Sequence, residues 1–473
     1  MKLSQLIAVD NDVEITGIAV DSRKVWKGNL FLCIRGERYD GHNYVEEALK
    51  NGAEMIVAEH SLGLSNEIVL PDTRRAAASI YATWYQNPQN KLRIYGVTGT
   101  NGKSSIVGIL HTIYRFAGFH SAVCGTLGCC WDAKHYPLEN TTPLPEILCE
   151  KMHEMVNDGV THLFMEVSSH ALALDRVSEI SFQYGVFSNL TPEHLDFHKT
   201  MDHYSATKEK LFLQSKRRVF NLDDPYGYLF HQRFLPHSIG YGKACSSDFV
   251  LDEIMYSDLD GTVFTVRHRN ERYTFTTLLT GEYNLYNLLA AISVAMSDGV
   301  HPEIIAKAIA SFEGVKGRLE CIYRGVFTVF LDYAHTPDAL ARVLAELRKS
   351  NPKRLRVLFG CGGDRDSQKR PVMGRIAQML ADDVIITSDN SRSEDPKKII
   401  EDILAGIEKN QPSRVTVLEN RKEALVWAIQ TALPQDVLLV AGKGHEEYEI
   451  DRSGKHPFSE TEIINQELNR FNF

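Results

Sequence analysis

The glycine-rich stretch at residues 98–105 limits what this chain can fold into more than any other. It reads Thr-Gly-Thr-Asn-Gly-Lys-Ser-Ser, and an apolar, β-branched run precedes it at residues 92–97. After it, apolar residues recur at helical spacing from Ile106 to Ala117, and Gly118 stands where a helix would end. A strand, a glycine loop and a helix in this order are typical of phosphate-binding loops. The stretch therefore predicts an α/β domain with a phosphate site at the start of a helix.

Each residue type in the loop suits a polyphosphate ligand. Gly99 and Gly102 let the backbone approach the phosphates, and the N–H groups and dipole of the helix start favour negative charge. Lys103 is placed to reach the outer phosphates, and the Ser104 hydroxyl can bind Mg²⁺. Val97 departs from the commonest pattern, which has glycine at that position. The alternative is a glycine-rich turn between strand and helix that happens to contain a lysine.

Composition sets the broad class of protein. A chain of 473 residues predicts two to four domains, and 43% hydrophobic with 24% charged residues is ordinary for a soluble globular protein. The net charge of −9 argues against a general nucleic-acid or anionic-membrane surface. Residues 1–12 lack the pattern of a signal peptide, and no apolar stretch approaches the length of a membrane span. We therefore expect a cytoplasmic protein that binds neither nucleic acid nor membrane.

The eight cysteines form no C-x-x-C pair and show no zinc spacing. In a reducing compartment, cysteines without such a pattern are usually buried thiols. We therefore expect free thiols rather than disulfides.

Polar residues follow two apolar runs in the middle of the chain. Glu166 comes directly after the run that ends at Met165, and His194 lies a few residues after the run that ends at Phe187. In an open parallel sheet, ligands bind at the carboxyl ends of the strands, so both side chains are expected near the glycine loop. A carboxylate and an imidazole there could bind a second metal ion of a nucleotide site. For either residue alone, a surface or structural role is the alternative.

The last third of the chain alternates strand and helix patterns again. The expected strands are residues 327–331, 355–359, 384–387 and 437–440, which predicts a second, doubly wound domain. It lacks Gly-x-Gly-x-x-Gly, so we expect no nicotinamide or flavin cofactor. A polar cluster follows each strand, at residues 332–335, 360–366, 388–392 and 442–446. One or two of these could be turns only, but the series as a whole predicts a second binding region.

Several of these motifs resemble the Mur ligases, the amide-forming enzymes of peptidoglycan precursor synthesis. The glycine loop is similar to their ATP loop and to that of the related folylpolyglutamate synthetase. The resemblance covers nearly the whole chain and is strongest to the branch that adds the third residue of the peptide, through Glu166-Val-Ser-Ser-His, His194-Leu-Asp-Phe-His, Asp332-Tyr-Ala-His-Thr-Pro and Gly442-Lys-Gly-His-Glu. It implies an α/β fold of three domains. These are a small N-terminal domain for the uridine nucleotide substrate at residues 1–90, a central ATPase domain with a mainly parallel sheet at 91–315, and a Rossmann-like, amino-acid-binding domain at 316–473, with a linker at 87–90.

The resemblance also implies an ATP site with two Mg²⁺ ions. The implied ATP contacts are Gly99, Thr100, Asn101, Gly102, Lys103, Ser104, Ser105, Asn284, Asn287, Arg318 and Asp332. Asn284 and Asn287 have a simpler alternative as caps of a helix start. The implied metal ligands are Ser104, Glu166, His194 and Lys208, where Lys208 carries a carbamate derived from CO₂ that turns a cation into an oxygen ligand. Lys210 is the rival for this modification, and Thr207 replaces the usual small residue before Lys208.

The resemblance implies two further groups of substrate contacts. The UDP-linked substrate is expected at Val20, Ser22, Asn140, Thr141, Thr142, Ser168 and Arg176. Ser22 could instead be a turn hydroxyl, and Leu174 stands where relatives commonly carry a glutamine. The amino acid is expected at Arg365, Asp389, Asn390, Ser391, Arg392, Gly442 and Glu446.

The residues at 389–392 bear on which amino acid is added. Relatives that add meso-diaminopimelate carry Asp-Asn-Pro-Arg, and this chain reads Asp-Asn-Ser-Arg. Relatives that add lysine usually lack the arginine. An arginine pairs with the distal carboxylate of diaminopimelate but repels the ammonium of lysine. Arg392 therefore favours meso-diaminopimelate, while Ser391 leaves another amine open.

The resemblance implies an ATP-dependent ligase for UDP-N-acetylmuramoyl-L-alanyl-D-glutamate, with Lys103, Glu166, His194 and Lys208 as its catalytic residues. The carboxylate of D-glutamate would be phosphorylated by ATP, and the amine of the amino acid would displace the phosphate. The alternatives are a paralogue that uses the same chemistry on another acyl or amine partner, and a regulator that binds ATP and the precursor without turnover. We expect a monomer.

Overall fold

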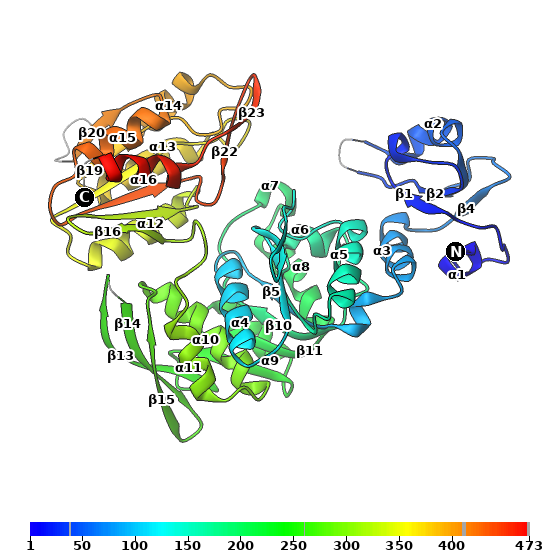
Figure 1. Ribbon diagram of the computed structural model, residues 1–473, viewed down its shortest axis with the longest axis horizontal. Coiled ribbons are helices and arrows are strands. Elements are labelled where there is room, and N and C mark those ends of the chain that lie inside the picture. Colours follow the sequence, from blue (N-terminus) through cyan, green and yellow to red (C-terminus); the bar gives the residue numbers. More distant parts are fainter. Residues whose placement is uncertain (37–38, 260, 409–412, 471–473) are drawn as a thin grey trace. The chain divides into compact units, whose positions relative to one another are not determined.

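The computed structural model describes residues 1–36, 39–259, 261–408 and 413–470. The chain forms two compact units, and each is described by itself. The first holds residues 1–255, 263–276 and 283–311, and the second holds residues 256–262, 277–282 and 312–473. The three domain boundaries expected from the sequence stay a prediction. Figure 1 shows the chain and labels many of its helices and strands.

The first unit begins with a small parallel sheet. Its strands lie in chain order: β1 (Gly17–Ala19), β2 (Asn29–Leu32), β3 (Ala53–Ala58) and β4 (Glu67–Val69). The helices here are α1 (Leu3–Leu6), α2 (Val45–Lys50) and α3 (Thr73–Trp84), with short 3₁₀ turns η1 (Ser22–Lys24) and η2 (Gly41–Tyr44). Strand β2 is buried along its whole length, as a run without polar alternation predicts for the inside of a parallel sheet.

The expected linker at residues 87–90 is an ordered turn, and its role between domains stays a prediction. Residues 88–91 form the 3₁₀ turn η3 (Pro88–Lys91), in which Pro88 and Gln89 are buried. The turn packs against α5 (Pro145–Asn157), and α3 lies along the same helix (Figure 1). Asn87 takes a left-handed φ of 52°, and proline suits the first position of a helical turn, so this polar stretch forms a turn.

The central sheet surrounds the glycine loop. Its order is β15-β14-β13-β12-β11-β10-β5-β9-β6-β7-β8, and the strands from β12 to β6 run parallel. The strands are β5 (Arg93–Thr98), β6 (Ser121–Gly125), β7 (Gly128–Trp131), β8 (Lys134–Tyr136), β9 (His162–Glu166), β10 (Phe182–Phe187), β11 (Ser215–Asn221), β12 (Ser238–Gly242), β13 (Phe249–Asp258), β14 (Gly261–His268) and β15 (Glu271–Thr277). Because β5 lies between β9 and β10, the glycine loop, Glu166 and the segment after Phe187 meet at one edge.

Helices follow the strands of this sheet in turn. They are α4 (Lys103–Phe116), α5, α6 (Ser169–Ala173), α7 (Leu195–His198), α8 (Met201–Leu213), α9 (Pro225–Arg233), α10 (Glu282–Ser297) and α11 (Pro302–Ala310). Helix α4 is amphipathic, and Ile106, Ile109, Leu110 and Ile113 are fully buried. Among the described residues, no helix has both the length and the apolar character needed to cross a bilayer.

One disulfide contradicts the expectation of free thiols. Cys124 and Cys129 form a disulfide across the antiparallel pair β6–β7, where they are directly opposed with their Cα atoms 4.1 Å apart. Opposed positions of a hairpin bring side chains together, and the sequence analysis did not foresee this hairpin. The six other cysteines are free, at positions 33, 130, 149, 245, 321 and 361.

The second unit carries the predicted doubly wound fold. Its six-stranded sheet has the order β16-β17-β21-β18-β19-β20, in which only β16 is antiparallel. The strands are β16 (Glu320–Arg324), β17 (Thr328–Asp332), β18 (Arg354–Phe359), β19 (Asp383–Ile386), β20 (Arg414–Val417) and β21 (Asp436–Ala441), followed by the hairpin β22 (Tyr448–Asp451) and β23 (Gly454–Pro457). The helices are α12 (Pro337–Lys349), α13 (Lys369–Leu380), α14 (Pro396–Leu404), α15 (Arg421–Gln430) and α16 (Glu460–Arg470).

The strand order explains where the four polar clusters lie. Strands β17, β21, β18 and β19 are consecutive neighbours and run parallel. Their carboxyl ends therefore share one edge of the sheet, as expected for a doubly wound fold. Each of the four predicted clusters follows one of these strands.

Candidate active site

The glycine loop has the backbone that its sequence predicts. Gly99 and Gly102 have φ values of 149° and 87°, and Gly102 is the residue just before α4. A Cβ atom at Gly99 would lie 1.9 Å from Ser188 Oγ, and one at Gly102 would lie 2.3 Å from Asn287 Oδ1. Glycine is therefore required at both positions by conformation and by space. The first N–H groups of α4 have no helical partner, which suits an anion.

Two residues that sequence reasoning did not assign hold the loop in place. Ser188 Oγ donates to the Asn101 carbonyl oxygen at 2.5 Å, and the Asn101 N–H donates to Asn189 Oδ1 at 3.0 Å. The Thr100 N–H donates to the Asn189 carbonyl oxygen at 2.8 Å. Both residues follow β10, which is the neighbour of β5 in the sheet. A Ser-Asn pair directly after an apolar strand was the signal that could have found them.

Two lysines converge on one carbonyl oxygen of the loop. Lys103 Nζ and Lys208 Nζ each donate to the Gly99 carbonyl oxygen at 3.0 Å, and Lys103 also donates to that of Thr100 at 2.8 Å. Lys208 is 1% exposed. Burial, together with the charge of Lys103, holds the pKa of Lys208 well below its usual range. Lys210, its rival, is 43% exposed and bonds to the Leu172 carbonyl oxygen, away from the loop.

Glu166 lies beside the loop hydroxyl, as the strand order requires. The Ser104 hydroxyl donates to Glu166 Oε1 at 2.9 Å, and the carboxylate is buried. Thr126, which sequence reasoning missed, holds the same carboxylate through its N–H at 2.8 Å and its hydroxyl at 3.2 Å. Thr126 sits in the β6–β7 turn beside the disulfide, so its role depends on the hairpin that the sequence did not reveal.

His194 lies on a strained turn close to the two lysines. Its φ is 56°, its ring centroid is 4.9 Å from that of His170, and its Nε2 is 3.8 Å from Glu193 Oε2. Partial burial lowers the pKa of His194, and the charges of Lys103 and Lys208 lower it further. The imidazole is therefore favoured in the neutral form that can bind a metal.

The donor set suits a hard cation at one position. Ser104 and Glu166 supply a hydroxyl and a carboxylate oxygen within hydrogen-bonding distance of each other, which are ligand types that Mg²⁺ prefers. Among the described residues, no three His, Cys, Asp or Glu side chains are arranged to hold a metal. The predicted set contains only two such residues, so this result does not bear on it. The ligand roles of His194 and Lys208 stay predictions.

Four of the residues predicted for the UDP-linked substrate lie together beside Glu166. The Thr142 hydroxyl donates to the Glu166 carbonyl oxygen at 2.9 Å and accepts from the Ser168 N–H at 3.0 Å. Thr141 and Thr126 have their hydroxyls 3.2 Å apart. Arg176 Nη1 donates to the Thr142 carbonyl oxygen at 2.9 Å, while its buried Nε has no partner among the described residues. An unpaired guanidinium N–H suits an anionic ligand.

Of the other three residues predicted for this substrate, Asn140 directly precedes Thr141, whereas Val20 and Ser22 lie near the start of the chain. Asn140 is exposed and Val20 is half-buried. Ser22 is buried, and its hydroxyl donates to Glu47 Oε2 at 2.5 Å, while Asn51 Nδ2 donates to the Ser22 carbonyl oxygen at 2.9 Å. The Ser22 hydroxyl is thus bonded within the N-terminal part of the chain, and its contact with the substrate stays a prediction.

Asn284 and Asn287 are brought to the glycine loop from a distant part of the chain. Both lie within the first turns of α10 and are buried. Asn287 Nδ2 donates to Asn284 Oδ1 at 3.3 Å, and Asn287 Oδ1 fills the space in front of Gly102. Both residues lie inside α10 rather than before its start, and their contact with ATP stays a prediction.

A substitution in the loop can distinguish an effect on the predicted ATP site from an effect on the stability of helix α4. We expect Gly102→Ala to raise the KM for ATP at least tenfold, because the new Cβ would displace Asn287 and a left-handed φ costs about 1–2 kcal/mol without glycine. The measurement is the ATP dependence of phosphate release. Gly118→Ala is the matched control, because Gly118 has a φ of 84° after the same helix with nothing within 4 Å of its Cβ position. An equal ATP effect in both variants would contradict the prediction.

In the second unit, Arg318 and Asp332 lie near each other. The Asp332 carboxylate accepts from the N–H groups of Leu319 at 2.6 Å and Ala334 at 2.7 Å. Burial raises the pKa of Asp332, and the charge of Arg318 opposes that rise. The Arg318 guanidinium lies 5.0 Å from the centre of the Tyr333 ring. Their contact with ATP stays a prediction.

The predicted amino-acid site is built from two loops held side by side. Arg370, 1% exposed, pairs with Glu394 and with Asp402 Oδ2, and the Asp364 N–H donates to the same Glu394 at 2.6 Å. The Gly363 N–H donates to the Asn390 carbonyl oxygen at 2.9 Å. These ties fix the loop at residues 360–366 against the loop at 388–395. Arg370 and Glu394 were not assigned from the sequence.

Arg392 projects from this junction. Its φ is 51°, its Nη1 donates to the Gly363 carbonyl oxygen at 2.8 Å, and its N–H donates to the Ile450 carbonyl oxygen at 3.0 Å. Arg365 is exposed on the facing loop. In the described part of the chain, neither the N–H nor the hydroxyl of Ser391 makes a hydrogen bond, so the proline of relatives would lose no bond there. Serine in place of proline at position 391 therefore changes no hydrogen bond of the predicted amino-acid site.

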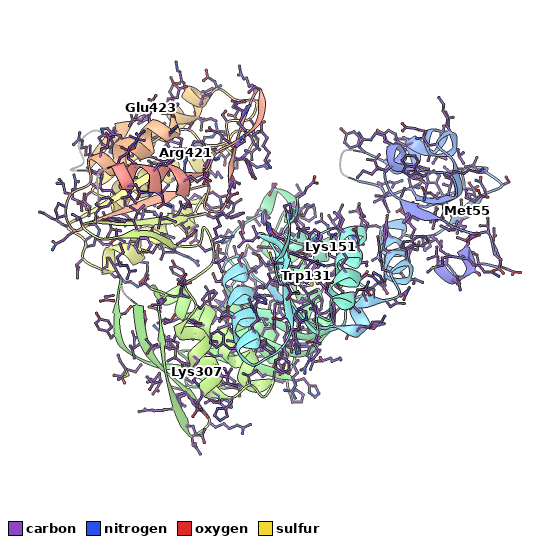
Figure 2. The ribbon with its side chains drawn as sticks, viewed as in Figure 1. Met55, Trp131, Lys151, Lys307, Arg421 and Glu423 are labelled. Carbon is purple, nitrogen blue, oxygen red and sulfur yellow. A yellow bond between two sulfur atoms is a disulfide. The ribbon has the colours of Figure 1, made fainter. Side chains whose placement is uncertain are left out.

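Buried charged residues also hold the loop at residues 388–395 in place. Arg421, labelled in Figure 2, donates to Glu460 Oε1 and to the carbonyl oxygens of Ser388 and Ala441 at 2.8–3.0 Å. Although burial alone would raise it, the pKa of Asp389 is lowered by Arg421 and Lys443. Gly442 has a φ of 115°, and a Cβ there would lie 2.7 Å from Asp389 Oδ2. Glycine at position 442 is thus required by the Asp389 carboxylate.

Comparisons with known proteins agree with these features. Family models match residues 14–87 (Mur ligase family, catalytic domain), 97–295 (Mur ligase middle domain) and 317–444 (Mur ligase, glutamate ligase domain). A UDP-N-acetylmuramoyl-L-alanyl-D-glutamate–2,6-diaminopimelate ligase of Syntrophomonas wolfei is 40% identical over 461 residues, which is 96% of this chain and 94% of the relative. The chain belongs to the Mur ligase family. The resemblance expected from the motifs is confirmed.

Other Mur ligases cover the chain equally well. The enzyme with the same name from Clostridium botulinum is 39% identical over 467 residues, which is 97% of this chain and 96% of the relative. A solved structure of a UDP-N-acetylmuramoyl-L-alanyl-D-glutamate–2,6-diaminopimelate ligase aligns with a TM-score of 0.73 and 30% identity, over 100% of this chain and 99% of that one. The predicted fold class, mixed α/β with parallel-rich sheets, is confirmed.

Proposed function

We propose that this Mur ligase adds meso-diaminopimelate to the D-glutamate of UDP-N-acetylmuramoyl-L-alanyl-D-glutamate, with hydrolysis of ATP to ADP and phosphate, in peptidoglycan precursor synthesis. The observation that carries the proposal is the convergence of three groups at one sheet edge. These are the glycine loop with Lys103, the Ser104–Glu166 pair and the Thr142–Arg176 cluster. The relatives named above bear the name of this reaction.

The order of chemical steps follows from the substrates. A carboxylate is a poor acyl donor because its leaving group would be an oxide. Transfer of the γ-phosphoryl group of ATP to the γ-carboxylate of D-glutamate forms an acyl phosphate and ADP. The amine of the amino acid then attacks the acyl carbon, the C–O bond to phosphate breaks, and the amine loses a proton as the amide forms.

The residues of the first unit supply positioning and charge. Lys103 and the N–H groups at the start of α4 face the phosphates, where negative charge shifts between oxygens during transfer. Arg176, with its unpaired Nε, suits the anionic UDP-linked substrate. The buried setting of Glu166, Thr142 and Lys208 keeps water from the acyl phosphate.

Mur ligases use ATP with Mg²⁺, and the donors described above suit the metal. Two Mg²⁺ ions would neutralise phosphate charge, one near Ser104 and Glu166 and one near His194 and Lys208. The shared Gly99 carbonyl oxygen supports a carbamate on Lys208. Two ammonium groups on one acceptor repel each other, whereas a carbamate on Lys208 would attract Lys103. Burial also lowers the pKa of Lys208, which favours its unprotonated amine, and only an unprotonated amine reacts with CO₂.

A substrate test separates the proposal from its rivals. Phosphate release is measured with UDP-N-acetylmuramoyl-L-alanyl-D-glutamate, ATP and each of meso-diaminopimelate, L-lysine and L-ornithine. The proposal expects release that needs both the precursor and an amino acid, with diaminopimelate preferred. Release with another amine or acyl partner would instead identify a paralogue. No release with any pair would identify a binding regulator.

Arg392 is expected to carry much of the preference for diaminopimelate. Its guanidinium suits the distal carboxylate, so Arg392→Ala should cost about 2–5 kcal/mol in kcat/KM for diaminopimelate, as for loss of one partner of a buried charge pair. The same substitution should not lower kcat/KM for lysine and should raise it if anything, because lysine lacks that carboxylate and its ammonium no longer meets the arginine charge. The measurement is kcat/KM for both amino acids in both proteins.

The control for this substitution is Arg452→Ala. Arg452 is an exposed arginine of the adjacent hairpin whose Nε donates to the Ser393 carbonyl oxygen. It should leave both amino acids unchanged. If the unaltered protein prefers lysine or ornithine, the assignment to diaminopimelate is wrong, although the ligase chemistry stands.

Location and assembly stay predictions. The substrates are ATP and a nucleotide-linked precursor, which supports a cytoplasmic site of action. We propose that the enzyme works as a monomer, because the predicted contacts for all three substrates can be assigned within one chain. Size-exclusion chromatography with light scattering tests this.

A further inference from the structure

Lys443 is a fully buried cation next to the predicted amino-acid site. It has 0% exposure, and its Nζ donates to Asn390 Oδ1 at 2.9 Å and to the Tyr448 carbonyl oxygen at 2.7 Å. The same nitrogen is 3.8 Å from Asp389 Oδ1 and 3.8 Å from Glu446 Oε2. A buried ammonium is costly unless it is paired and hydrogen-bonded. Three of these partners, Asp389, Asn390 and Glu446, belong to the loops predicted to hold the amino acid, and the fourth, Tyr448, begins strand β22.

The lysine fixes which way the Asn390 amide points. Asn390 Oδ1 accepts from Lys443 Nζ and from the Ile450 N–H, each at 2.9 Å. Both partners are donors only, so the amide oxygen must face them and the amide NH₂ must face the other way. On that side, Asn390 Nδ2 donates to Glu446 Oε2 at 2.8 Å.

This chain of bonds sets the position of a carboxylate that is open to a ligand. The Glu446 side chain keeps 13% of its surface exposed while one of its oxygens is held by Asn390. Burial raises the pKa of Glu446 and the Asp389 charge adds to the rise, while the Asn390 hydrogen bond and the charges of Lys443 and Arg392 act against it and favour the charged form. Glu446 thus offers a negative group near the positive Arg392. The pair is complementary to an ammonium and a carboxylate on one carbon atom, because Glu446 matches the ammonium and Arg392 matches the carboxylate.

We propose that Lys443 is a positioning residue for the incoming amino acid. It holds the Asn390 amide so that Glu446 accepts the ammonium group at the far end of that amino acid, while Arg392 takes the carboxylate beside it. The inference rests on the proposed function, because it takes the amino-acid substrate and the roles of Glu446 and Arg392 from it. Lys443 itself does not touch the substrate.

A structural role alone makes a different prediction. If Lys443 only balances Asp389 and Glu446 within the fold, its loss would lower stability and amount of active enzyme, and would not change KM for one substrate. If it acts through Asn390, its loss would weaken the amino acid selectively. The UDP-linked precursor has all its predicted contacts in the first unit, and ATP has most of its own there, with Arg318 and Asp332 in the second unit, so the two KM values report mainly on the rest of the enzyme.

The test compares three variants of the full-length enzyme with the unaltered protein. Lys443→Met is expected to raise the KM for diaminopimelate roughly 10- to 100-fold, as for loss of a hydrogen bond to a charged group, with the KM values for ATP and precursor within about twofold. Asn390→Ala should give a similar rise. The double variant should be no worse than Asn390→Ala alone, because a residue that acts through another is not additive with it.

Lys455→Met is the matched control. Lys455 is an exposed lysine whose Nζ lies 3.7 Å from the centre of the Tyr448 ring, on the same hairpin, so its loss should leave all three KM values unchanged. If Lys443→Met fails to fold, Lys443→Gln replaces it. The glutamine amide can still donate to Asn390, so an intermediate rise in KM is expected.

The outcomes are decisive in each direction. A selective, non-additive rise in the amino-acid KM supports the proposal. An unchanged amino-acid KM, an equal rise for all three substrates, or additive effects in the double variant overturns it. Failure of the unaltered protein to release phosphate with any amino acid would instead overturn the proposed function, so the two failures are distinguishable.

Discussion

Replacing Lys103 with alanine is expected to lower the ligation rate by about 10²–10³-fold or more, even at saturating ATP, while the protein folds normally. Lys103 Nζ lies on the loop carbonyl oxygens of Gly99 and Thr100, at the start of α4, where the transferring phosphoryl group would sit. Its charge acts on the developing phosphate charge rather than on packing. The measurement is phosphate release at saturating ATP, with a thermal melt of the same sample.

The control for this prediction is Lys307→Ala. Lys307 is an exposed lysine of α11 in the same unit, labelled in Figure 2. Its loss should leave the rate unchanged. Near-normal ligation by the Lys103 variant would mean that the glycine loop is only a turn between strand and helix, which was the alternative from the sequence.

Replacing Lys208 with alanine should abolish nearly all ligation, because the variant loses the carbamate proposed as a metal ligand. Added acetate is expected to restore part of the activity, since a small carboxylate can enter the space left by the side chain of this buried residue and supply the oxygen ligand. The measurement is phosphate release with and without acetate. The second readout is a CO₂ adduct on Lys208, detected in the folded protein under native conditions.

Lys210→Ala is the control on the same helix. Lys210 is 43% exposed and lies 3.5 Å from Asp175, so its loss should cost little activity. Full activity of Lys208→Ala, or inactivity of Lys210→Ala with an active Lys208 variant, would overturn the assignment. An unmodified Lys208 amine beside a bound metal in the active enzyme would also count against it.

Residues whose role lies in a local pattern could be predicted from the sequence. The glycine loop was recognised because its strand, glycines and helix are contiguous. In the structure Gly102 has a left-handed φ, which is the conformation that calls for glycine. Glu166 was found because polar residues after apolar strands collect at one edge of a parallel sheet, and it bonds to Ser104. The same rule predicted the four polar clusters of the second unit.

Residues whose role depends on a neighbour distant in the chain were missed. Thr126 holds Glu166 only because β6 pairs with β9, and Ser188 and Asn189 hold the loop only because β10 pairs with β5. The Cys124–Cys129 disulfide was not expected, because the hairpin that opposes the two cysteines was not foreseen. Sequence spacing carries no information about such strand order.

The sequence by itself determined the fold class, the family and the positions of the loops that bear chemistry, because these follow from periodicity and from contiguous motifs. The tertiary structure decided which side chains meet. Lys443 lies 53 residues from Asn390 in the chain. They meet because Lys443 follows β21 and Asn390 follows β19, and both strands run parallel to β18 between them, so that their carboxyl ends share one edge. At that edge the buried ammonium of Lys443 meets an amide oxygen and two carboxylates. Their hydrogen bond and charges offset the free energy that its burial costs.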